Sequence, residues 1–201
     1  QAQASLLKMY IDNKNLPKSL NLAKKYLKQA PQNREFQALA GIALFRSQQF
    51  PIAHELLMAS TQDNIPRQYV FESIAKLNIA KNNVDEGLAF FEKEYTSFPT
   101  AETARLIGNI YSGKKDYKQS SLYFRESIKM APNPSVRVQY SQSLFNEKKY
   151  AEAEKALAPL FSQDSKNPNV LILQANIYAK TNRFEEGKNL FEKAKIFLEN
   201  K

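Results

Sequence analysis

The strongest restriction on the fold of this chain is a pair of short amphipathic segments joined by a polar turn, residues 101–132. Apolar side chains recur at helical spacing in both segments: Leu106, Ile107, Ile110 and Tyr111 in the first, and Tyr117, Leu122, Phe124 and Ile128 in the second. Residues 113–116 are predicted to form the turn between them. A helical hairpin of this size has an apolar face that it cannot bury alone, so the pattern predicts a stack of such hairpins.

The same hairpin recurs six times, and an aromatic or branched residue at the start of each second segment marks its register. These residues are Leu16, Phe50, Val84, Tyr117, Tyr150 and Phe184, and their separations are 34, 34, 33, 33 and 34 positions. We therefore predict one elongated repeat domain over residues 1–201, with repeats at about 1–33, 34–67, 68–100, 101–133, 134–167 and 168–201.

Small residues stand at fixed places in nearly every hairpin, which indicates close contact between the two helices. Three positions after the register residue, the second segments carry Ser19, Ala53, Gly87, Ser120, Ala153 and Gly187. The matching position of the first segments holds Leu7, Gly41, Ala75, Gly108, Ser141 and Ala175, so only the first repeat departs. An irregular helical bundle, the alternative, has no reason to hold small residues at a fixed offset.

With this period and these small positions, the chain resembles the tetratricopeptide repeat family. Family aromatic positions are occupied by Tyr111 and Phe124, among others, which we expect in the core. The resemblance implies an all-α fold, a right-handed superhelical α-solenoid of six helix-turn-helix repeats. The expected helices span residues 2–13, 17–29, 34–47, 50–62, 67–81, 84–97, 101–113, 117–130, 134–147, 150–163, 168–181 and 184–199. Pro159 should kink the tenth helix or end it early.

The residue types in the chain argue against catalysis and against metal or cofactor binding. Because the chain has no Cys and one His, His54, neither a thiol nucleophile nor a Cys/His metal cluster can form. The acidic residues that open helices, such as Asp85 and Glu186, are explained by the helix dipole. We therefore expect a protein that is not an enzyme and has no cofactor.

The resemblance places the first helix of each repeat along a concave groove, which implies a protein or peptide partner there. The expected groove residues are apolar in the N-terminal half and rich in amides in the C-terminal half: Ile42, Phe45, Arg105, Asn109, Gln139, Gln142, Asn146 and Asn176. Amides suit the main chain of an extended peptide. A carboxylate clamp of the kind known in the family is not expected, because Asn169 and Leu173 stand where it needs cations.

The net charge of +9 leaves two other functions open. Residues 1–33 contain six Lys side chains and one acidic side chain, and most of these lysines fall on an expected outer face: Lys14, Lys18, Lys24, Lys25 and Lys28. That face is an alternative site for an acidic polymer, either a polysaccharide or a nucleic acid. We do not expect a nucleic acid partner, because an RNA-binding surface also needs Arg and exposed aromatic residues. A purely structural spacer or self-assembling element is the other alternative.

The two ends of the sequence suggest a piece of a longer protein. It begins at Gln1 without Met, and its Lys-, Asn- and Gln-rich repeats resemble those of bacterial multi-repeat envelope proteins, which favours the periplasm or cell envelope over the cytoplasm. No apolar run reaches the roughly 20 residues of a membrane span. In the last segment Gly187, Leu190, Phe191 and Ala194 should pack on their own hairpin, whereas Ile196, Phe197 and Leu198 should leave an apolar strip. We expect this strip to be covered either by further helix of a longer protein or by self-association.

Overall fold

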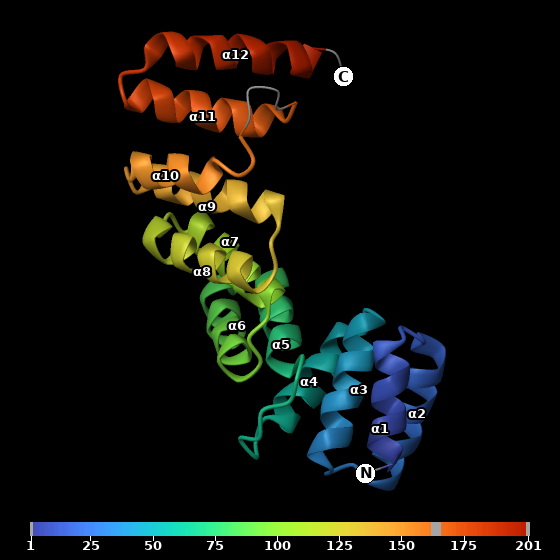
Figure 1. Ribbon diagram of the computed structural model, residues 1–201. Coiled ribbons are helices and arrows are strands. Elements are labelled where there is room, and N and C mark those ends of the chain that lie inside the picture. The colour runs from blue at the N-terminus through green and yellow to red at the C-terminus, as the bar shows by residue number, and fades with distance from the viewer. Residues whose placement is uncertain (1, 162–165, 200–201) are drawn as a thin grey trace. The chain divides into compact units, whose positions relative to one another are not determined.

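The computed structural model describes residues 2–161 and 166–199, and these residues form twelve α-helices and no strand (Figure 1). The helices are α1 Ala2–Asp12, α2 Leu16–Gln29, α3 Arg34–Arg46, α4 Phe50–Ser60, α5 Val70–Ala80, α6 Val84–Ser97, α7 Ala101–Gly113, α8 Tyr117–Met130, α9 Pro134–Asn146, α10 Tyr150–Leu157, α11 Pro168–Lys180 and α12 Phe184–Glu199. They pair as the six predicted hairpins, α1 with α2 through α11 with α12.

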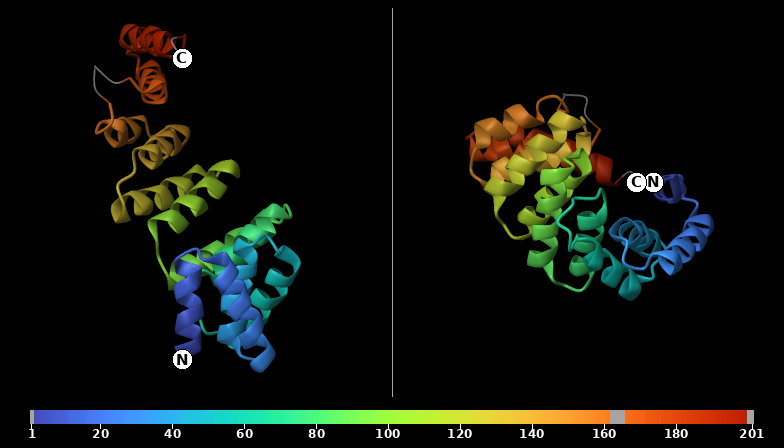
Figure 2. Two further views of the ribbon diagram at one scale, coloured as in Figure 1. Left: turned by 90° about the vertical axis from the view of Figure 1, so that its right-hand side faces the viewer. Right: turned by 90° about the horizontal axis from the view of Figure 1, so that it is seen from below.

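Contacts between helices divide the chain into two compact units, residues 1–99 and residues 100–201. The boundary falls where we predicted the third repeat to end, so each unit contains three hairpins. Figure 2 shows from two further sides that each unit consists of successive helix pairs joined by short connections. Assignment of the whole chain to one domain, and the right-handed superhelix, stay predictions.

Three helix ends differ from the predicted ranges by two residues or more. The connection from α4 to α5 covers residues 61–69, because Pro66 disfavours helix at Ile65 and the Arg67 guanidinium binds Asp63 and the carbonyl of Ser60. The third repeat therefore begins its first helix at Val70 instead of residue 67. Helix α10 ends at Leu157, which confirms the early stop predicted from Pro159, and its predicted end at residue 163 lies outside the described residues.

The predicted small residues lie where the two helices of each hairpin touch. All twelve are buried, including Leu7, the exception in the first repeat. A Cβ added to Gly108 would come within 2.8 Å of the Phe124 ring, and one added to Gly41 within 2.7 Å of the Leu57 side chain. A side chain at these points would push the helices apart, so the small residues set the spacing within the hairpin.

One expectation about an aromatic residue in the core is wrong. Phe124 is buried, but Tyr111 is only half-buried and stacks on Tyr123 with ring centroids 5.7 Å apart. Phe191, expected to pack on its own hairpin, is 40% exposed. Ile196 and Leu198 are exposed as predicted, whereas Phe197 is half-buried.

Every hairpin turn contains one residue in the left-handed conformation, two positions before the second helix. These residues are Lys14, Gln48, Asn82, Lys115, Lys148 and Asn182, with φ between 55° and 66°. In the fourth hairpin the N–H of Asp116 donates to the carbonyl of Tyr111 and the N–H of Lys115 donates to that of Ser112. This is the Schellman pattern, which ends the first helix and turns the chain directly into the second.

Buried Glu94 caps the start of helix α5 from the neighbouring helix α6. Its Oε1 accepts from the backbone N–H of Tyr69 at 2.8 Å, although Glu94 is only 2% exposed. Burial raises the pKa of Glu94 above its usual value, the backbone N–H groups oppose that shift, and the nearby charge of Glu72 adds to it. Glu94 thus takes the place of a capping side chain at the N-cap position, since the N-cap residue Tyr69 makes no side-chain capping bond.

Replacing Gly108 with Ala should destabilise the protein, because the added Cβ meets the buried Phe124 ring. We expect a loss of about 1–3 kcal/mol in the free energy of unfolding, as for other overpacked cores. Gly113→Ala is the matched control, because a Cβ there has no neighbour within 4 Å. It should leave stability unchanged or raise it by up to about 1 kcal/mol. Urea denaturation measures both, and equal effects of the two variants would contradict the close contact.

Glu94→Gln should make the protein less sensitive to pH. Since the folded-state pKa of Glu94 is raised, the stability due to its bound proton is fully present below the unfolded-state pKa of about 4.3 and is lost as pH rises through the folded-state pKa. The melting temperature of the variant should therefore rise relative to that of the wild type as pH increases from about 4 to 7. Exposed Glu86→Gln on the same helix is the control. A constant difference between Glu94→Gln and wild type would show that the pKa is not raised.

Candidate functional site

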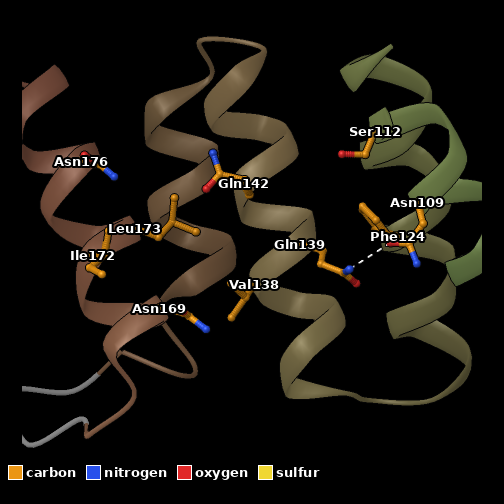
Figure 3. Close-up of a pocket in the computed structure, with 10 residues that line it drawn as sticks. All are labelled: Asn109, Ser112, Phe124, Val138, Gln139, Gln142, Asn169, Ile172, Leu173 and Asn176. Atoms are coloured by element: carbon orange, nitrogen blue, oxygen red, sulfur yellow. Dashed lines mark hydrogen bonds between the residues drawn. The ribbon is translucent and has the colours of Figure 1, made fainter. Parts of the chain in front are cut away.

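Three successive first helices of the second unit, α7, α9 and α11, face a common open cavity of about 320 Å³ (Figure 3). Regular helical spacing brings the lining residues of α11 onto one face, at positions i, i+3, i+4 and i+7. The cavity is lined by Asn109, Ser112, Phe124, Val138, Gln139, Gln142, Asn169, Ile172, Leu173 and Asn176. We call this surface the amide groove.

Hydrogen bonds between side chains hold part of the amide groove in place. Gln139 Nε2 donates to Asn109 Oδ1 at 2.9 Å, which links α9 to α7, and the bond is drawn in Figure 3. Gln142 Nε2 donates to Asn146 Oδ1 at 3.1 Å within α9. Each amide has more donors and acceptors than these bonds use, so the Asn109 amino group and the Gln139 oxygen can still serve a ligand.

Apolar side chains form the floor between the amides. Val138 and Ile172 are half-buried, and Leu173 is buried in the core cluster that joins α9, α10 and α11. None of the ten lining residues is acidic, basic or His. What the amide groove offers is therefore hydrogen bonding and apolar contact, without ionic interactions. A smaller adjoining cavity, about 240 Å³, continues the surface past Gln139 and Asn169 to Pro134 and Ser135.

Four of the predicted groove residues line the cavity, and two others lie at its margin. Asn109, Gln139, Gln142 and Asn176 belong to the lining. Asn146 takes part through its bond to Gln142. Arg105 is one turn before Asn109 on α7 and forms an ion pair with Glu102 at 2.6 Å. The pKa of Arg105 is raised by this hydrogen bond, which keeps the guanidinium engaged on its own helix.

The two predicted residues of the first unit lie in a different setting. Ile42 is 3% exposed and belongs to the core of α1–α5, so its side chain has little surface for a partner. Phe45 is half-buried, and its ring lies 5.8 Å from that of Phe50. One cavity in this unit includes two residues at groove-facing positions of the repeat register, Arg46 and Tyr69. The rest of its lining comes from the first hairpin: Asp12, Lys14 and Leu16.

The apolar floor of the amide groove follows from the same repeat register. Val138, Ile172 and Leu173 stand at groove-facing positions of the fifth and sixth first helices, and all three line the cavity. Val138 and Ile172 each lie four residues before an amide on the same helix face, Gln142 and Asn176. Over the described residues, no three His, Asp or Glu side chains gather as a metal site requires.

Comparison with known proteins agrees with the hairpin architecture. Two models of the tetratricopeptide repeat family match residues 106–134 and 144–196. The solved structure of YrrB, described as a tetratricopeptide repeat protein with an unusual peptide-binding site, has a TM-score of 0.77 at 15% identity and covers 87% of this chain and 91% of its own. No curated protein matches the sequence at a significant level.

Two other solved structures share the fold at low identity. The C-terminal part of a repeat-containing protein from Cytophaga hutchinsonii has a TM-score of 0.72 at 12% identity, covering 96% of this chain and 78% of its own. For PilF of Pseudomonas aeruginosa the TM-score is 0.65 at 16% identity, covering 94% of this chain and 87% of its own.

Twelve helices paired in hairpins with a regular period, over the described residues, define the chain as an all-α helical repeat solenoid. More specifically, the two family matches, over residues 106–134 and 144–196, identify it as a tetratricopeptide repeat protein. Among the described helices, none has both the length and the apolar character needed to cross a membrane.

Proposed function

We propose that this protein is a non-enzymatic interaction scaffold that binds an extended peptide segment of a protein partner in the amide groove. The observation that supports this most is the placement of Asn109, Gln139 and Asn176 on three successive first helices around one cavity. A peptide main chain has one donor and one acceptor per residue, and an amide side chain can pair with both. The peptide-binding site described for YrrB, a protein of the same fold, agrees with this function.

The chemistry of the lining defines the kind of segment that would fit. Because Val138, Ile172 and Leu173 form the floor, the segment should place an apolar side chain there while its main chain follows the amides. An acidic or basic segment gains no ion pair from this lining. Binding should therefore depend little on salt, in contrast to binding driven by phosphate or carboxylate groups.

A basic surface on α2 and the turn before it supports the alternative of an acidic polymer. All five lysines of this surface, Lys14, Lys18, Lys24, Lys25 and Lys28, are exposed, and α2 contains no acidic residue. Only electrostatic attraction would hold a polymer there, so its affinity should fall steeply between low and high salt. Titration of heparin as a model polyanion at several salt concentrations separates this function from peptide binding.

Removing two amides from the groove should weaken peptide binding without unfolding the protein. A short peptide selected on the wild-type chain from a random library serves as the probe. Asn109→Ala with Gln139→Ala should weaken its binding by about ten- to thirtyfold, because each hydrogen bond contributes about 1 kcal/mol. Isothermal titration calorimetry measures the affinity, and circular dichroism should show unchanged helicity.

Matched variants locate the effect within the groove. Asn21→Ala with Asn189→Ala removes two exposed amides elsewhere and should bind the peptide as the wild type does. Ile172→Asp should abolish binding, because it puts a charge on the apolar floor. Arg105→Ala tests whether the segment also reaches the start of α7. If the selected peptides bind the Asn109 and Gln139 double variant with wild-type affinity, the site lies elsewhere.

A further inference from the structure

An open cavity of about 470 Å³ in the first unit differs in its chemistry from the amide groove. It lies where α1 ends, α2 begins, α3 ends and α5 begins, and its lining is Asp12, Lys14, Leu16, Arg46 and Tyr69. Three of these side chains are charged, whereas the lining of the amide groove contains no charged side chain. We call this cavity the Arg46 pocket.

Two contacts fix the guanidinium of Arg46. Its Nη1 donates to the backbone carbonyl of Ile11 in the last turn of α1, a position where cationic side chains often bind the final carbonyls of a helix. The guanidinium also lies over the Tyr69 ring, with Cζ 5.9 Å from the ring centroid. Because these contacts already restrict its rotamers, the Arg46 side chain loses little further freedom when it binds a ligand.

Tyr69 is itself held by buried Glu94. The N–H of Tyr69 donates to Glu94 Oε1 at 2.8 Å, and Tyr69 stands at the N-cap of α5 with a left-handed φ of 68°. A series of contacts therefore runs from α6 to α1: Glu94 binds Tyr69, Tyr69 stacks with Arg46, and Arg46 binds Ile11. This series gives the Arg46 pocket a preformed wall, as ligand sites usually have.

Charged groups in the Arg46 pocket still have hydrogen-bonding capacity. A guanidinium carries several N–H donors in a planar fork, and the Ile11 carbonyl uses one of them. Within the described part of the chain, neither the Lys14 ammonium nor the Asp12 carboxylate makes an ion pair. The two cations outnumber the single anion, and residues 1–33 around them contain six Lys and one acidic residue. The electrostatic field there favours an anionic ligand.

We propose that the Arg46 pocket binds an acidic side chain, Asp or Glu, of a peptide segment, with an apolar neighbour of that residue packed on Tyr69 and Leu16. The planar fork of Arg46 suits a carboxylate, because both oxygens can accept a hydrogen bond from it. Lys14 adds a second positive charge at the exposed side of the pocket. The Arg46 pocket is separate from the amide groove, and its proposed ligand does not depend on the peptide-binding function of that groove.

Asp12 limits the ligand to a single negative charge. Its carboxylate lines the same pocket, so it repels each anionic group that enters. A sulfated or phosphorylated polymer brings several such groups, whereas one Asp or Glu side chain brings one. The Arg46 pocket should therefore prefer a carboxylate within a mostly neutral segment over a polyanion.

Peptide selection on the full chain tests the proposal. The bait is the double variant Asn109→Ala with Gln139→Ala, which lacks two amides of the amide groove, and the probe is the most enriched peptide from a random library. Enriched peptides should share one Asp or Glu next to an apolar residue, and the probe should lose its binding when that acid is replaced with the matching amide. A selection that returns no binder, or binders without a shared acidic residue, would contradict the proposal.

Variants of the lining locate the probe in the Arg46 pocket. Fluorescence anisotropy measures its affinity, and circular dichroism checks folding. Arg46→Gln should weaken binding by about 10- to 100-fold, because a hydrogen bond between ionised groups is lost. Lys14→Gln, at an exposed position, should weaken it by about two- to fivefold and remains informative should Arg46→Gln unfold. Asp12→Asn should strengthen binding, because it removes a repulsive charge.

A matched control comes from the second unit, where Arg137 also donates to a carbonyl in the last turn of a helix, that of Ala156, at 3.4 Å. Arg137→Gln should bind the probe as the wild type does. Lys24→Gln with Lys25→Gln, on the basic surface of α2, should weaken heparin binding far more than probe binding.

Two results would overturn the assignment of the acid to the Arg46 pocket. One is an equal loss of probe affinity in Arg46→Gln and Arg137→Gln, which would mean that no particular guanidinium is required. The other is weaker binding in Asp12→Asn, which would show that no anionic group of the probe lies near that carboxylate.

Discussion

The two helices of each hairpin approach each other closely, and this contact holds the hairpin together. The other contacts of the fold depend on it. The close approach is possible because a residue with little or no side chain stands at each crossing, as where Gly108 lies against the Phe124 ring. Dispersion and apolar burial then act over a short distance along the whole hairpin. Polar small residues serve equally well when they find a partner. Ser120 and Ser143 show this, because their hydroxyls bond across the contact between one hairpin and the next.

The same spacing, repeated every 33 or 34 residues, has a functional consequence. It brings equivalent faces of α7, α9 and α11 to one side of the second unit, so residues about thirty positions apart, such as Asn109 and Gln139, become neighbours. A row of amides on a repeating frame is a different kind of site from a catalytic cleft, because it offers hydrogen bonds at intervals and holds no titratable group in its lining. Such a surface is suited to recognising the main chain and shape of a partner.

Helical spacing and side-chain size are local properties, so the period, the hairpin register and the residues at the helix crossings could be predicted from the sequence alone. Most of the amide groove could be predicted too, since Asn109, Gln139, Gln142 and Asn176 occupy regular positions on first helices. Which neighbouring element covers each helix face was decided only by packing in the folded chain. Periodicity specifies the direction of a side chain, whereas burial depends on the neighbour that covers it.

Three residues that fit the apolar pattern of their helices show this difference. Ile42 lies in the core, Tyr111 lies at an edge and Phe191 remains exposed. The left-handed backbone conformation in the turns could not be predicted from the sequence either. Lys115 and Lys148 adopt the left-handed conformation because the Schellman hydrogen bonds require it, and a Lys side chain gives no sign of that in advance.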